Sequence, residues 1–147
     1  MIKSLLIFLI LLLPLTAENL NKNLSWGVIV LDFTGFRNNN GQLFVAIYND
    51  SSAFLNKNKI PALKLKNNIE KEHFRIILDS VQFGEYALSC FHDENNNGIL
   101  DKNLFGLPSE GYGLSNNVKP SLGPPSWNDC KFVLNKDTLL LEIKIRY

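Results

Sequence analysis

The sequence predicts an all-β protein that carries one long loop. Short stretches alternate apolar and polar side chains with a period of two, and turn-forming Asn, Gly and Pro residues separate them. No stretch of useful length has the 3.6-residue period of an amphipathic helix. The chain, at 147 residues, has the length of one domain. We therefore expect about seven short strands in an antiparallel β-sandwich, with a small β-barrel as the alternative.

The N-terminal segment has the layout of a secretory signal peptide. A short basic start with Lys3 precedes the apolar run 5–13, and the segment ends in small residues at Ala17. The run is much shorter than the roughly 20 residues of a membrane-spanning helix. We expect a signal peptide over residues 1–17 and one domain over residues 18–147, exported to the periplasm or the exterior. An uncleaved N-terminal anchor is the alternative.

The charge of the mature chain is balanced. Removing the signal peptide takes away Lys3 and no acid, so 14 basic side chains remain against 14 acidic ones. The mature chain has no cluster of basic residues that would bind the phosphate backbone, so nucleic acid is not an expected partner. No later apolar run is long enough to span a membrane. We expect a protein or carbohydrate partner, whose identity the sequence leaves open.

Two strands near the N-terminus are expected to pair. Residues 26–33 form an apolar run that suits a strand buried on both faces, and residues 42–48 alternate between two faces. Asn40 and Gly41 between them suit the turn of a hairpin. Further strands are expected at residues 62–66, 72–78, 86–92, 130–134 and 138–147.

One tyrosine indicates the type of sandwich. Tyr86 follows Gly84 by two residues at the start of its strand, which is the pattern of a tyrosine corner. We therefore expect the sandwich to be immunoglobulin-like or prealbumin-like.

The two cysteines, Cys90 and Cys130, suggest a disulfide. An even cysteine count is typical of disulfides in exported proteins, and both residues fall on the apolar side of expected strands. Closing a loop of about 40 residues would stabilise the fold by roughly 4 kcal/mol in the chain-entropy model. The alternative is two buried free thiols that pack as small hydrophobic groups.

The stretch D-E-N-N-N-G-I-L-D, residues 93–101, has the ligand spacing of a calcium loop. Counted from the first aspartate, oxygen-bearing side chains stand at positions 1, 3, 5 and 9, a glycine stands at position 6, and position 7 offers a carbonyl. The expected ligands are Asp93, Asn95, Asn97, Ile99 through its carbonyl, and Asp101.

Two departures weaken the match to calcium loops. Position 12 is Leu104 instead of a bidentate glutamate, and positions 3 and 5 are asparagines. We therefore expect weak binding, in the ~10⁻⁴–10⁻³ M range of extracellular modules, unless Glu110 folds back to join the set. The alternative is a metal-free loop in which Asp and Asn side chains accept hydrogen bonds from neighbouring backbone N–H groups. Magnesium fits less well because it demands a stricter octahedron.

A longer block resembles a known family. The stretch Y-A-L-S-C-F-H-D-E-N-N-N-G-I-L-D-K-N-L-F-G-L-P-S-E-G-Y-G, with the later G-P-P-S-W-N-D-C-K-F, is similar to bacterial exported proteins known as domain of unknown function 2141. The resemblance covers residues from about 26 to 147 and implies one small exported β-sandwich domain in a bacterium. It implies no activity, substrate or binding residue. The chain departs from the family at Asn96, where glycine is usual, and at Cys90 and Cys130, where aliphatic or small residues are usual.

Other side chains suggest weaker hypotheses. Tyr112 and Trp127, flanked by glycines and prolines, suit a ligand-binding surface that stacks sugars, or else they cover the core beneath the loop. A hydrolase that uses Glu94 or Glu110 finds little support, since no triad or nucleophile motif accompanies them. We expect a non-enzymatic module with calcium as its possible cofactor. A metal-free structural or adhesion module of the cell envelope is the alternative.

Overall fold

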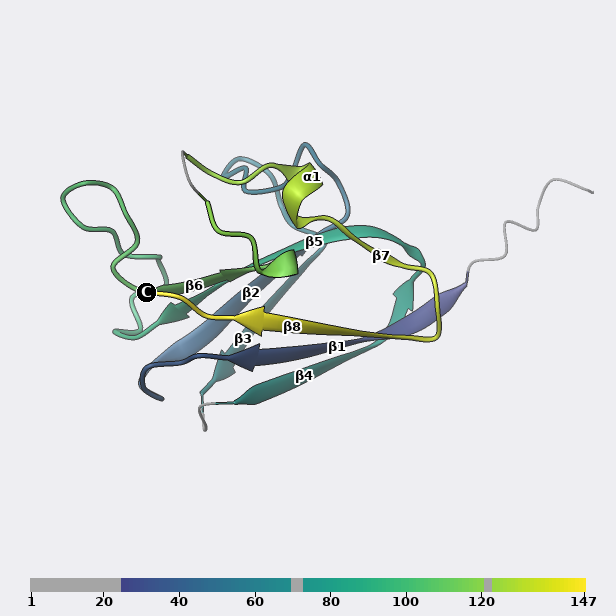
Figure 1. Ribbon diagram of the computed structural model, residues 1–147, viewed down its shortest axis with the longest axis horizontal. Helices are drawn as coiled ribbons and strands as arrows, with labels where there is room; N and C mark the ends of the chain where they lie inside the picture. Colours follow the sequence, from purple (N-terminus) through teal and green to yellow (C-terminus); the bar gives the residue numbers. More distant parts are fainter. Residues whose placement is uncertain (1–24, 70–72, 121–122) are drawn as a thin grey trace, which may run out of the picture.

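In the part of the chain that the structure describes, eight strands form two sheets with the core between them (Figure 1). The computed structural model describes residues 25–69, 73–120 and 123–147, and the expected signal peptide lies outside them. One sheet has the order β4 (Phe74–Gln82), β1 (Trp26–Thr34), β8 (Thr138–Lys144). The other has the order β3 (Leu63–Asn68), β2 (Gln42–Tyr48), β5 (Gly84–Asp93), β6 (Gly111–Leu114), and β7 (Phe132–Leu134) pairs with β5.

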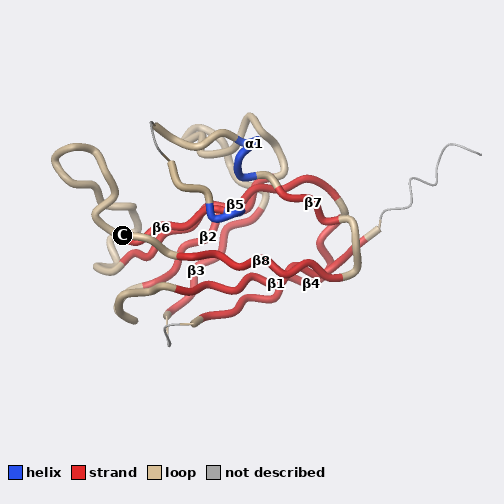
Figure 2. Tube along the Cα trace, in the orientation of Figure 1, coloured by secondary structure: helices blue, strands red, loops and turns tan. Residues whose placement is uncertain are grey.

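The predicted all-β class is confirmed. Helix is confined to a 3₁₀ turn at Ser115–Asn117 and to α1 (Trp127–Cys130) in the described chain (Figure 2). No helix in the described residues has both the length and the apolar character needed to cross a membrane. β6 is the strand that was not predicted. Its four residues were assigned to the long loop because two of them are glycines.

The pairing of strands is mostly antiparallel, with one exception. β1 pairs antiparallel with β4 but parallel with β8, in register from Val28 opposite Thr138 to Thr34 opposite Lys144. The two sheets also meet at one side, where Tyr112 of β6 and Arg146 exchange two backbone hydrogen bonds of 2.8 and 2.9 Å. This bridge joins the sheet that carries the long loop to the end of the chain.

The predicted hairpin of residues 26–33 and 42–48 is wrong. β1 and β2 belong to different sheets, and the connection between them passes from one sheet to the other. Gly41 adopts a positive φ of 71°, as a turn residue does, but the turn redirects the chain across the core instead of reversing it within one sheet. β1 is also buried mainly on its core side, since Val28 and Val30 on its other face are half-exposed.

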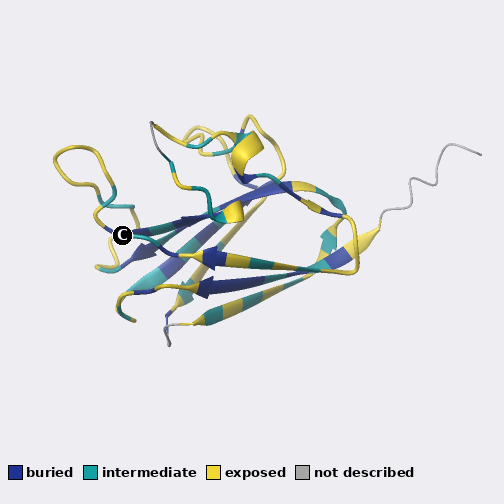
Figure 3. Cartoon of the chain, viewed as in Figure 1, coloured by how far each residue is buried: buried dark blue, intermediate teal, exposed yellow. Residues whose placement is uncertain are grey.

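The core fills the space between the two sheets. Figure 3 shows more buried residues alternating with less buried ones along β1, β2 and β4, as a strand with one face toward the core requires. The fully buried apolar side chains come from both sheets: Ile29, Leu31, Phe33, Leu43, Leu88, Leu134, Ile143 and Ile145. The tyrosine corner is present, because the hydroxyl of Tyr86 donates a hydrogen bond of 2.7 Å to the carbonyl of Gln82.

The predicted disulfide between Cys90 and Cys130 is not formed. Cys90 faces the main core from β5, with its Sγ 3.6 Å from the carbonyl oxygen of Gly113. Cys130 ends α1 and packs with Ala87 in a separate apolar cluster. Residue 130 lies in a helical turn and not in β7, so its side chain does not follow the alternation expected of a strand. Both thiols are free and buried.

Candidate functional site

Asp93, the last residue of β5, closes the start of the calcium-like loop. Its side chain is 0% exposed, and its two carboxylate oxygens accept hydrogen bonds from the backbone N–H groups of Asn97 at 3.1 Å and Gly98 at 2.8 Å. Gly98 has a positive φ of 80°, which permits the bend at position 6. The loop therefore folds around the carboxylate of its first residue.

The two asparagines and Asp101 form the opposite side of the loop. The side-chain amide groups of Asn95 and Asn97 donate to the same Oδ2 of Asp101, at 2.7 and 3.0 Å. The Oδ1 of Asn95 accepts from the N–H of Asn97, and the Oδ1 of Asn97 accepts from the N–H of Ile99. These are the local side-chain turns that Asn favours, and they leave the Ile99 side chain exposed.

Glu110 folds back onto the loop. Its side chain is only 5% exposed, and it accepts one hydrogen bond from the N–H of Glu94 at 2.9 Å and one from the N–H of Asp101 at 3.1 Å. One carboxylate thus ties the first turn of the loop to its last residue. The expected return of Glu110 to the loop is therefore seen, while its role as a metal ligand stays a prediction.

Glu94 is fixed by the connection between β1 and β2. Arg37 donates to it through Nε at 2.9 Å and through Nη2, and the amide of Asn38 donates at 2.6 Å. The hydrogen bond from Arg37 is the main reason that the pKa of Glu94 lies below its usual value. Glu94 therefore does not point to solvent as a free carboxylate, and it belongs to the wall of the loop.

His92 is buried beside the loop but does not pair with Asp93. Its Nε2 lies 2.6 Å from the carbonyl oxygen of Asn40, and its Nδ1 lies 2.6 Å from the hydroxyl of Tyr147. A carbonyl only accepts, so Nε2 carries its proton, and the tyrosine hydroxyl donates to Nδ1 when that nitrogen is unprotonated. Both nitrogens thus tie the start of the loop to the β1–β2 connection at Asn40 and to Tyr147 at the end of the chain.

The predicted ligand residues are brought together, although their carboxylates do not form a metal cage alone. Among the described residues, no three or more His, Cys, Asp and Glu side chains gather closely enough to hold a metal ion. In the described chain, no Lys, Arg or His side chain lies within 4.0 Å of the carboxylates of Asp93, Asp101 or Glu110. Three acidic groups therefore share one loop and receive hydrogen bonds from neutral donors only.

The loop also carries an apolar projection that the sequence analysis missed. Residues 102–108, here called the finger, extend from the loop between Asp101 and Glu110 (Figure 1). The finger exposes Leu104 completely, Phe105 at 89% and Leu107 at 61%. The run L-F-G-L was visible in the sequence, but nothing in its pattern separated an exposed tip from a buried one.

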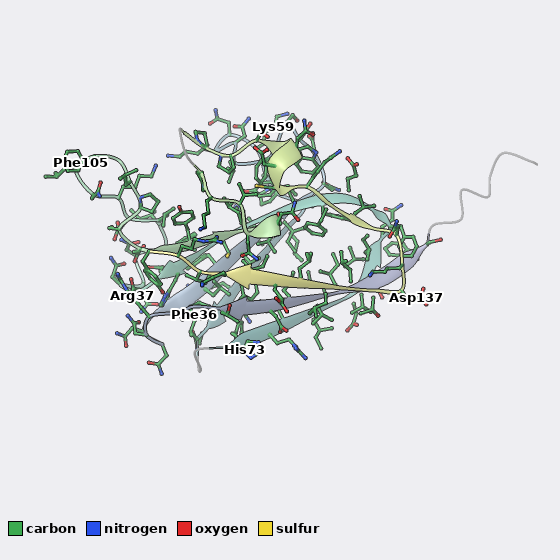
Figure 4. The ribbon with its side chains drawn as sticks, in the orientation of Figure 1. Phe36, Arg37, Lys59, His73, Phe105 and Asp137 are labelled. Atoms are coloured by element: carbon green, nitrogen blue, oxygen red, sulfur yellow. The ribbon has the colours of Figure 1, made fainter. Side chains whose placement is uncertain are left out.

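The backbone of the finger is ordered by its own hydrogen bonds. The Oδ1 of Asn103 accepts from the N–H groups of Phe105 and Leu107, at 2.9 and 3.1 Å. The N–H of Asn103 donates to the carbonyl of Leu107, and Lys102 and Pro108 form a β-bridge. Figure 4 shows Phe105 at the far end of the finger, pointing away from the sheets.

Tyr112 and Trp127 lie in the packing over one sheet. Tyr112 is in β6 and Trp127 is in α1, and both half-buried rings contact the apolar cluster of Ala87, Leu114 and Cys130. Trp127 also meets Phe54 edge-on, with 5.9 Å between ring centroids. The two rings thus help to cover the sheet beneath α1.

The fold and the loop define a small two-sheet β-domain with a long Asn- and Gly-rich loop between two paired strands. The model of a family described as "uncharacterized protein conserved in bacteria (DUF2141)" matches residues 31–140, and the chain belongs to this family. No curated protein and no solved structure matches the chain significantly.

Proposed function

We propose that the protein is a non-enzymatic, exported β-sandwich module whose 93–101 loop binds calcium weakly and, once ordered by it, presents the finger to a protein or carbohydrate partner. The observation that supports this most is the return of Glu110 to the loop. Its buried carboxylate accepts from the backbone N–H groups of Glu94 and Asp101, so it lies against the loop that carries Asp93 and Asp101, and none of the three has a cationic side chain within 4.0 Å among the described residues. A cation bound by the loop would be attracted by these carboxylates.

The asparagines fit a calcium ligand set. In the structure, their amide N–H groups donate to Oδ2 of Asp101. The partial positive charge of these groups therefore lies beside the carboxylate oxygen that would attract a cation. Rotation of either amide would turn Oδ1 toward that place, at a cost of about 1 kcal/mol for each local hydrogen bond given up. This cost would weaken binding further, in the same direction as the low ligand charge that underlies the expected ~10⁻⁴–10⁻³ M range.

The two acids considered for a hydrolase are already engaged. Glu94 accepts from Arg37 and Asn38, and Glu110 accepts from two backbone N–H groups. A general acid or base needs an oxygen free to exchange a proton with substrate. These contacts favour a binding module over a hydrolase.

Thermal unfolding of the mature chain in calcium, in magnesium and in chelator tests the proposal. A ligand that binds only the folded state stabilises it by about 1.4 kcal/mol at a tenfold excess over its dissociation constant. We expect the unfolding midpoint to rise with millimolar calcium and to change much less with magnesium.

Asp101→Asn is the informative variant, since it keeps an oxygen that accepts from the amides but removes one charge. We expect it to fold in chelator and to lose the calcium response. Asp137→Asn, at the opposite end of the molecule from the finger (Figure 4), is the matched control and should keep the response. A response retained by Asp101→Asn would exclude the loop as the site.

The closed hydrogen-bond network supports a second candidate, a metal-free structural or adhesion module of the cell envelope. In the described structure, the carboxylates of Asp93 and Glu110 each accept two backbone hydrogen bonds from the loop itself. This candidate requires the same unfolding midpoint in calcium and in chelator. It also requires Asp93→Ala to destabilise the chain equally in both conditions.

A further inference from the structure

We propose that Asn97 and Gly98 form a self-modifying site, at which the folded loop promotes the loss of ammonia from the Asn97 side chain. The reaction is the deamidation of an Asn-Gly pair, in which the backbone nitrogen after the asparagine attacks the side-chain carbonyl carbon. The evidence is that each of the three reacting polar atoms has a hydrogen-bond partner that favours this step. The modification itself does not depend on calcium, and only its consequence for calcium binding rests on the proposed function.

The attacking nitrogen belongs to Gly98. Its N–H donates to Oδ2 of the buried Asp93 at 2.8 Å. A carboxylate at this distance is placed to accept the proton that the nitrogen loses when it attacks. Gly98 has no side chain to obstruct ring closure, and a Cβ built on it would meet nothing within 4 Å. The nucleophile is therefore unobstructed and in contact with a base.

The side-chain amide of Asn97 is held at both of its polar atoms. Its Oδ1 accepts from the N–H of Ile99 at 2.9 Å, and its Nδ2 donates to Oδ2 of Asp101 at 3.0 Å. When the nitrogen adds to Cγ, negative charge develops on Oδ1, and the N–H of Ile99 stabilises it as a donor of an oxyanion hole does. Asp101 contacts the nitrogen that must leave, so a carboxylate is in place to pass a proton to it.

The reaction needs only water as a co-reactant. A bond forms between the Gly98 nitrogen and Cγ of Asn97, and the bond from Cγ to Nδ2 breaks. The proton of the Gly98 N–H passes through a carboxylate and solvent to Nδ2, which leaves as ammonia. Water then opens the succinimide ring. Cleavage of its Cγ–N bond gives aspartate on the normal backbone, and cleavage at the backbone carbonyl gives isoaspartate.

A second Asn-Gly pair provides a comparison within the same chain. Residues 38–41 repeat the sequence N-N-N-G of residues 95–98, but the fold holds the two pairs differently. A Cβ on Gly41 would lie 1.8 Å from the carbonyl oxygen of Asp93, so this glycine is closely packed. The carbonyl oxygen of Asn40 accepts a hydrogen bond of 2.6 Å from His92, which fixes the peptide unit that would have to rotate for ring closure. Because the local sequence is the same, a difference in reactivity between the pairs must come from the fold.

Asn95 provides a second comparison, inside the loop. Its Oδ1 accepts from the N–H of Asn97 at 3.0 Å, and its Nδ2 donates to Asp101 at 2.7 Å, much as the amide of Asn97 does. The residue that follows it is Asn96, whose side chain hinders attack by the backbone nitrogen. We therefore expect the modification at Asn97 and not at Asn95.

An aspartate at position 97 would add a carboxylate to the calcium-like loop. Asn97 stands at position 5 of the ligand spacing, and Asp93, Asp101 and Glu110 are the charged members of the predicted ligand set. Calcium affinity depends on the number of charged ligands, so the deamidated loop should bind calcium more tightly than the original loop. The loop would then gain a stronger site through chemistry that follows folding.

Peptide mapping of the natural mature chain tests the proposal, with the chain kept folded in chelator or unfolded in guanidinium chloride. Trypsin places the two Asn-Gly pairs in different peptides, 38–57 and 76–102, and fragmentation in the mass spectrometer locates the exchange of NH₂ for OH. In guanidinium chloride we expect equal rates at Asn40 and Asn97. In the folded chain Asn97 should react at least as fast as in guanidinium chloride. Asn40 should react at least about tenfold more slowly than in guanidinium chloride, because its reaction requires local opening.

Asp93→Asn tests the base. It should slow the reaction at Asn97 in the folded chain and leave the rate in guanidinium chloride unchanged, and circular dichroism shows that the variant is folded. Asp137→Asn, far from the loop (Figure 4), is the matched control and should change neither rate. Slower reaction of Asn97 in the folded natural chain than in guanidinium chloride would overturn the proposal, because the contacts would then protect the residue. Equal rates at Asn97 and Asn40 in the folded chain would also overturn it.

Asn97→Asp tests the consequence for calcium separately. Its unfolding midpoint should rise more in millimolar calcium than that of the freshly prepared natural chain. An equal rise in both chains would show that a carboxylate at this position does not strengthen the site. No rise in either chain would overturn the proposed calcium function, while the rates of deamidation in chelator would still decide the modification site.

Discussion

Gly41 joins the start of the 93–101 loop to the crossover between the sheets. A Cβ at this position would lie 1.8 Å from the carbonyl oxygen of Asp93, and the residue also has a positive φ of 71°. Gly41→Ala should therefore destabilise the fold by about 1–3 kcal/mol through overpacking, in addition to the cost of the left-handed backbone. Urea unfolding followed by circular dichroism measures the difference.

Gly106→Ala measures the backbone part of this effect alone, so the difference between the two variants gives the steric part. Gly106 has a similar φ of 77°, but a Cβ there would meet nothing within 4 Å. This variant should lose only about 1–2 kcal/mol, the cost of placing a side chain in the left-handed region. Equal losses in the two variants would contradict a close contact between Gly41 and the loop.

The thiols of Cys90 and Cys130 should be inert in the folded protein. Burial raises the pKa of the Cys90 thiol well above its usual range and that of Cys130 to about 11, so little thiolate exists at pH 8. We expect iodoacetamide to label neither cysteine until denaturant is added, and then to label both. Mass spectrometry of the intact chain gives the number of adducts. Fast labelling of the folded chain, or two missing hydrogens before labelling, would contradict two buried free thiols.

Single residues show where sequence reasoning works and where it stops. The spacing of the predicted loop ligands was readable because they are neighbours in the chain, and the return of Glu110 was anticipated as a condition for stronger binding. The contact of Arg37 with Glu94 spans 57 positions, and no local pattern contains it. Exposure of the finger was equally hidden, since L-F-G-L has the same composition whether it is buried or exposed.

Elements were predicted better than their partners. Alternation located most of the strands, because one face of each meets the core. It did not say which sheet a strand joins, since β1 and β2 present equally apolar faces to the same core from opposite sides. The hairpin prediction failed for this reason. Strand β6 was missed because Gly111 and Gly113 have no side chain to alternate, although a Cβ at either position would collide with Ile143, Ile145 or Tyr147.

The tyrosine corner tests an element that the sequence did predict. Tyr86→Phe removes the hydroxyl that donates to Gln82 and leaves the ring, so we expect a loss of about 1 kcal/mol, the usual net contribution of one hydrogen bond. Urea unfolding gives the loss directly. Tyr48→Phe is a fair control, since no described residue forms a hydrogen bond with the hydroxyl of that buried tyrosine. An equal loss in both variants would show that the hydrogen bond of the tyrosine corner adds no stability of its own.

At the scale of the whole molecule, ionisable groups set the pH range in which the two sheets remain folded. Asp32 of β1 accepts two hydrogen bonds of 2.6 Å from Arg75 on the adjacent β4, and this contact lowers its pKa. The pKa of Glu94 is lowered in the same way by Arg37. A carboxyl whose folded pKa is depressed stabilises the fold above its unfolded pKa, about 4, and loses that contribution as the pH falls through the folded value.

The free energy of unfolding should therefore decrease below about pH 4 to 5, and this decrease should depend on Asp32. We expect the free energy of unfolding of Asp32→Asn to lie below that of the natural chain at neutral pH and to approach it as the pH drops. Urea unfolding at a series of pH values gives both curves. Two parallel curves down to pH 2 would show that the carboxylate of Asp32 is not the group that couples these strands to pH.

At alkaline pH, stability should decrease as the pH rises, and the cause is the ionisation of buried tyrosine and cysteine side chains. Burial raises the pKa of Tyr86 above its usual value of about 10, as it does for the two thiols. A raised folded pKa means that the contribution is complete below the unfolded pKa and is lost as the pH rises toward the folded value. Stability should therefore be level from about pH 5 to 8 and decline from about pH 9, where unfolded thiols ionise first.

Replacing both cysteines with alanine should flatten the start of this decline, even if it lowers the plateau. A decline unchanged in that variant would place the alkaline sensitivity in the tyrosines, where Tyr86→Phe provides the next comparison.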